Sequence, residues 1–111
     1  MAISKAHKFN HVQNRVADIA KALANPARIA IIQHIAAKQS CICNDLVEEL
    51  PLSQSTISQH LNELKRVGLI KGEVDGPKVC YCIDNEVWEE AKEALNIFFE
   101  SNKPDCTDQC C

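Results

Sequence analysis

Two helix-length segments separated by a short turn constrain the fold of this chain more than any other feature. Asn44 can cap a short helix that ends near Leu50-Pro51, because the residue before a proline disfavours helix. Ser53 is a good N-cap for the next helix, and Gly68 is placed to end it. The three-residue turn between them gives helix-turn-helix spacing.

A strand–turn–strand pattern follows this pair of helices. Residues 69–74 and 79–83 are strand-like runs, and Asp75-Gly76 between them is a hairpin signal. A hairpin at this place in the order is where the wing of a winged helix-turn-helix would lie.

Three further amphipathic helices are predicted around this unit. Phe9 to Leu23 places apolar residues at alternating spacings of three and four, and Asn25-Pro26 starts a second helix that runs to about Ala37. Asp84 or Asn85 caps a last helix with an apolar stripe from Trp88 to Phe98. The fold class is therefore mostly α with a β-hairpin wing (α+β), a winged helix-turn-helix.

The chain has the size of one domain, and its charge is unevenly distributed. Its 111 residues contain no interdomain linker, so residues 1–102 are expected to form one DNA-binding and dimerisation domain and residues 103–111 a flexible, Cys-rich tail. The net charge of −3 alone argues against a nucleic-acid partner. However, residues 1–40 contain six basic residues and one acidic residue, whereas more than half of all the acidic residues lie after residue 79. The total charge is therefore a poor guide to local partners.

Seven cysteines are the second unusual feature of the composition. The N-terminal residues have no apolar signal segment, so we expect a cytoplasmic protein, in which thiols act as ligands or redox groups more often than as structural disulfides. Cys41-Ile42-Cys43 lies just before the first helix of the helix-turn-helix. Two thiols two residues apart share a face only in an extended segment, so this stretch is expected to be extended or loosely helical if both bind one ion. The alternative is that both are small buried hydrophobic residues.

A second Cys-x-Cys, Cys80-Tyr81-Cys82, falls on the second strand of the predicted hairpin. Its two sulfurs should face one side and Val79, Tyr81 and Ile83 the other. Because the latter are the better core residues, the thiols are expected to be accessible. The alternative is that both are half-buried strand residues. The tail adds three more cysteines, which are possible further ligands or passive or redox-active thiols: Cys106, Cys110 and Cys111.

The chain resembles the ArsR/SmtB family of winged-helix metalloregulators over roughly residues 9–100. The resemblance rests on four segments in order: Leu23-Ala24-Asn25-Pro26-Ala27-Arg28, Cys41-Ile42-Cys43-Asn44-Asp45-Leu46, Leu52-Ser53-Gln54-Ser55-Thr56-Ile57-Ser58-Gln59-His60-Leu61 and Gly68-Leu69-Ile70. It implies a homodimer formed through the first and last helices that binds double-stranded operator DNA.

Specific residues are expected at the DNA by that resemblance. Short amide and hydroxyl side chains suit base edges in the major groove, although the same polar face would also suit an ordinary solvated helix. The candidates for the DNA-facing surface are Gln54, Ser55, Thr56, Ser58, Gln59 and His60. The candidates for phosphate contacts are Lys65, Lys71 and Lys78, with Arg66 nearby.

The resemblance also implies an inducer. A Cys-x-Cys at Cys41 and Cys43 looks like the family's inducer-binding motif, and soft thiolates favour soft ions. Arsenic(III) or antimony(III) is expected first, with cadmium, lead or zinc as alternatives. Arsenic(III) takes three sulfurs, but the position where some arsenic sensors have a third Cys is Leu46, and the last helix has no His for a zinc site of the family's type.

Two other interpretations of the thiols stay open. Oxidation or persulfidation of a cysteine pair could drive release from DNA in the same fold. Alternatively, Cys41, Cys43, Cys80 and Cys82 could form a structural zinc site in a small metal-handling protein without an operator, although zinc modules usually space their cysteines two to four residues apart. The sequence has no nucleophilic constellation and no phosphate-binding loop, so no enzyme activity, membrane contact or RNA partner is expected.

Overall fold

The computed structural model describes residues 6–38, 41–42, 50–76 and 78–104 of the chain. A short 3-10 helix, η1 (Ala6–Lys8), is followed by helices α1 (His11–Leu23) and α2 (Pro26–Lys38). Helix α4 (Gln54–Val67), strands β1 (Ile70–Asp75) and β2 (Lys78–Ile83), and helix α5 (Asn85–Glu100) complete the order. The short helix expected from Asn44 lies outside the described residues.

The helix boundaries follow from their capping residues. Asn10 and Gln13 form a reciprocal capping box at the start of α1, which satisfies two backbone N–H groups. Ser53 accepts a hydrogen bond from the backbone N–H of Thr56, and Gly68 ends α4 in the left-handed region at φ 91°. Asp84 accepts from the N–H of Val87 at the start of α5. The predicted caps of the fourth and last helices are thus confirmed.

The two strands form an antiparallel hairpin whose register runs from Ile70↔Ile83 to Asp75↔Lys78. The predicted wing is therefore confirmed, with Gly76 at φ 63° in the turn. On its other side, β2 pairs with Ile42 through an isolated antiparallel bridge to Tyr81. Its two hydrogen bonds are 2.9 and 2.7 Å long, so the chain is extended at Ile42, whereas Cys43, the other end of the stretch expected to be extended if both thiols bind one ion, lies outside the described residues.

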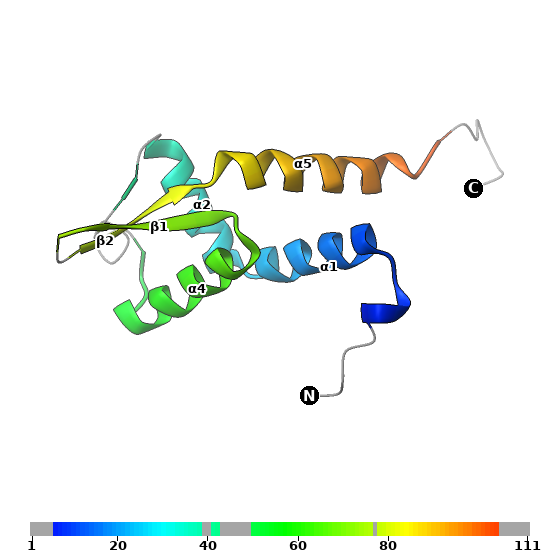
Figure 1. Ribbon diagram of the computed structural model, residues 1–111. Coiled ribbons are helices and arrows are strands. Elements are labelled where there is room, and N and C mark those ends of the chain that lie inside the picture. Colours follow the sequence, from blue (N-terminus) through cyan, green and yellow to red (C-terminus); the bar gives the residue numbers. More distant parts are fainter. Residues whose placement is uncertain (1–5, 39–40, 43–49, 77, 105–111) are drawn as a thin grey trace.

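The core lies where α1, α2 and α4 meet the base of the hairpin. Its largest fully buried side chains are Ile19, Ile31, Ile35, Leu64 and Leu69. Helix α5 runs alongside α1, with Arg15 and Glu90 paired at 2.9 Å (Figure 1). This arrangement of four described helices and one hairpin is the winged helix-turn-helix that the sequence predicts.

Helices α1 and α5 leave large apolar side chains uncovered. Four of them are more than half exposed, as is Phe9 just before α1: Val12, Ile97, Phe98 and Phe99. Within the described residues, no helix is both long enough and apolar enough to cross a membrane. The exposed apolar surface at α1 and α5 is thus available for a contact with another protein chain.

Candidate functional site

Helix α4 presents a polar face to solvent because its apolar stripe faces the core. Ile57, Leu61, Leu64 and Val67 are buried, and they turn the opposite face of the helix outward. Of the six side chains predicted to face DNA, Gln54, Ser55, Ser58 and Gln59 are exposed, whereas Thr56 and His60 are half-buried. The N-terminal half of the helix therefore exposes four side chains that carry an amide or a hydroxyl group. In helix-turn-helix proteins, the N-terminal residues of this helix contact the bases.

The side chain of His60 contacts Arg28 on α2. Its Nδ1 atom lies 3.3 Å from an Nη atom of Arg28, and the Nε of Arg28 donates to the carbonyl of Ala22 at 2.6 Å. Arg28 thus ties the end of α1 to α4. This contact fixes how α4 sits on the two helices that carry it.

The basic residues near α4 fall into two groups. Lys65 and Lys71 are exposed, and the Nζ of Lys65 lies 6.0 Å from the centre of the Tyr81 ring.

Arg66 instead binds Glu63 and Asp18 through hydrogen bonds of 2.8 to 3.2 Å. The guanidinium of Arg66 lowers the pKa of Glu63, mainly through these hydrogen bonds, and the two carboxylates raise the pKa of Arg66. Lys78 is the first residue of β2.

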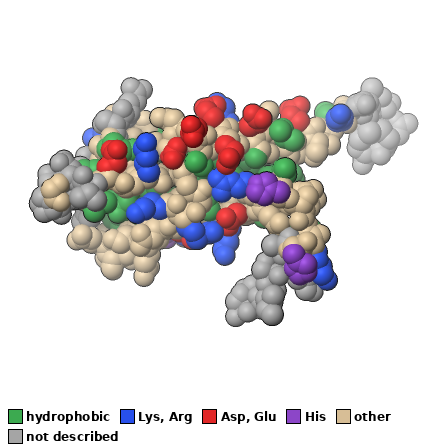
Figure 2. Space-filling view, viewed as in Figure 1, with side chains coloured by type: hydrophobic (Ala, Val, Ile, Leu, Met, Phe, Trp, Pro, Cys, Tyr) green, Lys and Arg blue, Asp and Glu red, His purple; other side chains and the backbone are tan. Residues whose placement is uncertain are grey.

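Charge is segregated across the molecule. Figure 2 shows acidic side chains gathered along α5, on the upper edge of the view, with basic side chains below them. The acidic residues of α5 are Glu86, Glu89, Glu90, Glu93 and Glu100. A negatively charged helix is an unfavourable surface for DNA, because the phosphates carry the same sign of charge.

The bridge between Ile42 and Tyr81 brings two distant cysteines together. Cys41 precedes Ile42 and Cys82 follows Tyr81, so an antiparallel pairing places them opposite each other. Their Cα atoms are 4.3 Å apart and their sulfurs form a disulfide. Cys80 is disulfide-bonded as well. The structure thus joins the first Cys-x-Cys segment to the second, which the main sequence interpretation treated as two separate sites and only the zinc-site alternative grouped together.

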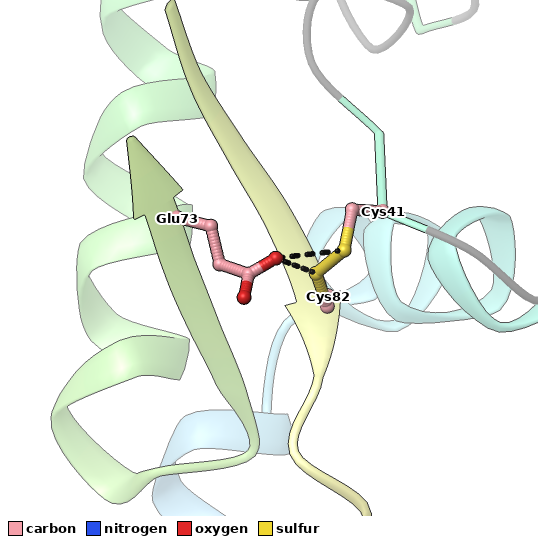
Figure 3. Close-up of side chains that lie close together, drawn as sticks. All are labelled: Cys41, Glu73 and Cys82. Atoms are coloured by element: carbon pink, nitrogen blue, oxygen red, sulfur yellow. Dashed lines mark hydrogen bonds between the residues drawn. A yellow bond between two sulfur atoms is a disulfide. The ribbon is translucent and has the colours of Figure 1, made fainter. Parts of the chain in front are cut away.

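Glu73 on the neighbouring strand completes a three-residue cluster. Its Oε1 atom lies 3.3 Å from the Sγ of Cys41 and 3.4 Å from that of Cys82 (Figure 3). Among the described residues, Cys41, Glu73 and Cys82 are the one group of His, Cys, Asp and Glu side chains whose ligand atoms all lie within 4.8 Å of one another. Once the disulfide is reduced, the two thiols can donate to the carboxylate or bind an ion beside it.

The expected exposure of the wing thiols is wrong. Cys80 and Cys82 are only 5% and 9% exposed, whereas Val79 on the opposite side of the strand is 43% exposed. Tyr81 and Ile83 do pack against the core, as predicted. The thiols are nevertheless buried, and the segment at Cys41 and Ile42 covers the outer edge of β2 through the isolated bridge between Ile42 and Tyr81.

Several predicted ligands cannot be placed. Cys43 and the tail residues Cys106, Cys110 and Cys111 lie outside the described part of the chain. Glu73 was not among the predicted ligands. Its signal in the sequence was weak: an acidic residue on the first strand at a position opposite a Cys-x-Cys.

An open cleft of about 530 Å³ adjoins the sulfurs. Apolar side chains from α2, β2 and α5 line it, namely Ile35, Ile83 and Trp88. The polar part of its lining includes Lys71 and Glu73, beside Cys41 and Cys82. The thiol cluster is thus reached through a space larger than a single ion requires.

Known proteins match the chain in sequence. The family model described as a helix-turn-helix domain matches residues 23–73. An uncharacterised HTH-type transcriptional regulator of Methanocaldococcus jannaschii is 38% identical over 80 residues, which are 70% of this chain and 89% of that protein. The arsenical resistance operon repressor of Staphylococcus aureus is 31% identical, covering 77% and 81%. The HTH-type transcriptional repressor SmtB of Mycobacterium tuberculosis is 41% identical over 64 residues, which are 58% of this chain but only 47% of that repressor.

Solved structures match the fold. An ArsR-like transcriptional regulator from Rhodococcus superposes with a TM-score of 0.68 at 21% identity, covering 80% of this chain and 83% of the other. A homodimeric winged helix-turn-helix DNA-binding domain from Mycobacterium bovis, a possible ArsR-family regulator, gives 0.65 at 25% identity, covering 91% and 93%. The hairpin after α4, the polar face of that helix and these relatives together show that the chain belongs to the ArsR/SmtB family of winged-helix transcriptional regulators.

Proposed function

We propose that the protein is a homodimeric repressor that binds operator DNA and is released when arsenite or antimonite binds its cysteine thiolates. The observation that carries the inducer part is the contact between Cys41, which precedes the helix-turn-helix, and Cys82 of the wing, with Glu73 beside both. The relatives of this chain include an arsenical resistance operon repressor, which supports the same signal.

DNA binding is assigned to the exposed polar face of α4. Gln54, Ser55, Ser58 and Gln59 would meet base edges, with Thr56 and His60 behind them, and Lys65, Lys71 and Lys78 would contact phosphates. The exposed apolar side chains of α1 and α5 support a dimer through these helices, as does the homodimeric state of a related solved domain. Two-fold symmetry would place the two copies of α4 about 34 Å apart, one turn of DNA.

The ligand set for the ion begins with Cys41 and Cys82. Cys43 remains a ligand predicted from the sequence, and Cys80, Cys106, Cys110 and Cys111 are possible additional thiols. Sulfur ligands favour soft acceptors, so cadmium and lead are the next candidates, followed by zinc. The family to which the chain belongs argues against a metal-handling protein without an operator.

Release would follow from where the two thiols lie. An ion bound by Cys41 and Cys82 fastens the segment leading into the helix-turn-helix to the wing. If this arrangement fits the operator less well, the ion and the DNA oppose each other with a coupling free energy of about 1–3 kcal/mol, a 5- to 150-fold change in affinity.

Operator-binding anisotropy with the reduced full chain tests this function. Arsenite should release the wild type, whereas Cys41→Ser and Cys82→Ser should stay bound. Ala37→Ser, an exposed change on α2 away from the residues that surround the two sulfurs, is the control and should respond like the wild type. If arsenite releases Cys82→Ser as readily as the wild type, the assigned inducer site is wrong.

A thiol-redox signal is the second candidate, and the disulfide between Cys41 and Cys82 favours it. Two thiols would lose two protons and two electrons to a two-electron oxidant such as hydrogen peroxide, which becomes two molecules of water. The same anisotropy assay distinguishes the signals. Release by peroxide, reversed by dithiothreitol and absent with arsenite, would select the redox function.

A further inference from the structure

We propose that Arg28 is a positioning residue for DNA recognition, because it holds His60 of α4 as a neutral imidazole whose Nε2–H donates to DNA. This inference rests on the proposed operator binding and assigns roles to two residues within that function. It is carried by the contacts that one guanidinium group makes with α1 and α4.

The end of α1 fixes the orientation of the Arg28 guanidinium. Its Nε donates to the carbonyl of Ala22 at 2.6 Å, and Nη2 donates to the carbonyl of Lys21 at 3.3 Å. Both carbonyls belong to the last turn of α1, where carbonyl groups have no partner further along the helix. The guanidinium is planar and rigid, so these two bonds also set the direction of Nη1, which lies 3.3 Å from Nδ1 of His60.

This contact leaves one role for the Nδ1 atom of His60. A guanidinium donates hydrogen bonds and has no acceptor, so Nδ1 has to be the acceptor of the pair. A neutral imidazole carries one proton, which is then on Nε2. A proton on Nδ1 would place two donors against each other. Arg28 therefore selects the neutral form of His60 and one of its two tautomers.

The other ring nitrogen of His60 points away from Arg28, on the polar side of α4. His60 follows the exposed Gln59 and lies one turn after Thr56, and its own side chain is half-buried. The exposed amides and hydroxyls of α4 can donate or accept, whereas an imidazole held in this tautomer can only donate. It suits an acceptor on a base edge, such as O6 or N7 of guanine or O4 of thymine, and disfavours the amino groups of cytosine and adenine.

Two amide substitutions test which ring nitrogen the DNA uses. The amide of Asn takes the approximate place of Nδ1, whereas the longer Gln places its amide near Nε2. His60→Gln keeps a donor for DNA and should bind within about 3-fold of wild type, less than a full hydrogen bond is worth for each copy of α4. His60→Asn should bind about 5- to 150-fold more weakly, the loss of one neutral hydrogen bond from each of two copies of α4. Anisotropy with a labelled duplex, selected from a random library by the wild-type protein, measures both. Equal affinities for the two variants, or the reverse order, would overturn the inference.

A double-mutant cycle separates positioning by Arg28 from a purely structural role. Arg28→Gln should weaken binding of the same duplex by about 2- to 10-fold in the wild type, but not in a His60→Ala background. Lys21→Gln is the control, because it removes a positive charge nearby and keeps the backbone carbonyl that Arg28 contacts. Its effect should be the same in both backgrounds. If Arg28→Gln also has equal effects in both, Arg28 does not act through His60.

The tautomer is observable without DNA. Nitrogen-15 NMR of the full chain at roughly pH 8, above the ~6.5 pKa of free histidine, should show a protonated Nε2 and an unprotonated Nδ1 for His60. The resonances of His60 are those that disappear in His60→Gln. A proton on Nδ1 would overturn the inference. A wild-type protein that selects no duplex would instead refute the proposed function, and the spectrum would still decide whether Arg28 holds His60 in this tautomer.

Discussion

Arg66 is the residue whose ionic contacts are most completely defined. It donates to both oxygens of Asp18 on α1 and to both oxygens of Glu63 one turn earlier on α4. It was considered as a phosphate contact, but these two carboxylates already balance its charge. Arg66, Asp18 and Glu63 therefore form a set of ion pairs that links α1 to α4, here called the clasp. Lys65, the neighbour of Arg66, is the better candidate for contacting DNA.

The clasp predicts a pH-dependent stability. Because Arg66 lowers the pKa of Glu63, the stabilising effect of the ionised carboxylate is present above the unfolded pKa and is lost as the pH falls through the lower folded pKa. Glu63→Gln should thus reduce the free energy of unfolding at pH 7 by about 0.5–1 kcal/mol, with the difference from wild type shrinking below about pH 4. Urea denaturation of the wild type and Glu63→Gln at pH 7 and below about pH 4 measures this difference in unfolding free energy.

Glu89→Gln is the control for that comparison. Glu89 belongs to an exposed pair with Lys92 at 3.8 Å, also three residues apart on a helix. Its replacement should change the unfolding free energy much less than Glu63→Gln does. An equal loss from both variants would mean that the clasp contributes nothing beyond an ordinary surface pair.

Helix α4 depends on its N-terminal cap at the scale of the element. Ser53→Ala removes the hydroxyl that accepts from the backbone N–H of Thr56 at 3.3 Å, and should cost about 1 kcal/mol of unfolding free energy. Ser58→Ala, an exposed change within the same helix, should cost less than half as much, because alanine is the better helix former. Thermal or urea denaturation of the two variants checks this.

The exposed face of α4 makes a separate prediction about DNA. Gln59→Ala should weaken operator binding by about 1–3 kcal/mol, roughly 5- to 150-fold, if its amide reads a base edge. Gln33→Ala on α2 removes the same exposed group away from that face and should bind like wild type. Anisotropy at fixed salt measures both, and equal affinities for all three proteins would remove α4 from the interface.

Local patterns predict the elements of this molecule better than the contacts between them. Ser53, Gly68 and Asp84 mark helix ends because capping is decided within a few residues. The two Cys-x-Cys pairs were grouped only in the alternative zinc site, and the pairing of Cys41 with Cys82 was not identified, because it depends on where a segment 41 residues away is placed by the packed core. Alternation of Cys around Ile42 and around Tyr81 was visible, but it indicates only that each pair shares a face. It does not indicate that the faces meet.

At the scale of the whole molecule, the apolar ends of α1 and α5 predict self-association. Ile97, Phe98 and Phe99 are all more than half exposed, and the two phenyl rings lie edge to face at 5.2 Å. Phe99→Glu should shift the protein from dimer to monomer and weaken operator binding in parallel, because a charge would have to be buried in the interface.

Sedimentation equilibrium measures that shift, with Asn96→Glu as its control. Asn96 is an exposed polar residue of the same helix, so its replacement adds the same charge without removing apolar surface. A dimer that survives Phe99→Glu unchanged would place the interface elsewhere.

The position of the disulfide in the chain has one further consequence, which concerns covalent topology. The link between Cys41 and Cys82 closes a ring of the chain that contains all of α4 and β1, so the helix proposed to read DNA lies inside a covalent loop. Closing a ring of this length reduces the entropy of the unfolded chain by an amount worth about 4 kcal/mol. The reduced protein, which is the form that the proposed inducer binding requires, is therefore the less stable of the two. A protease cut within the ring would leave the oxidised fragments covalently joined, whereas the reduced fragments would have no covalent link.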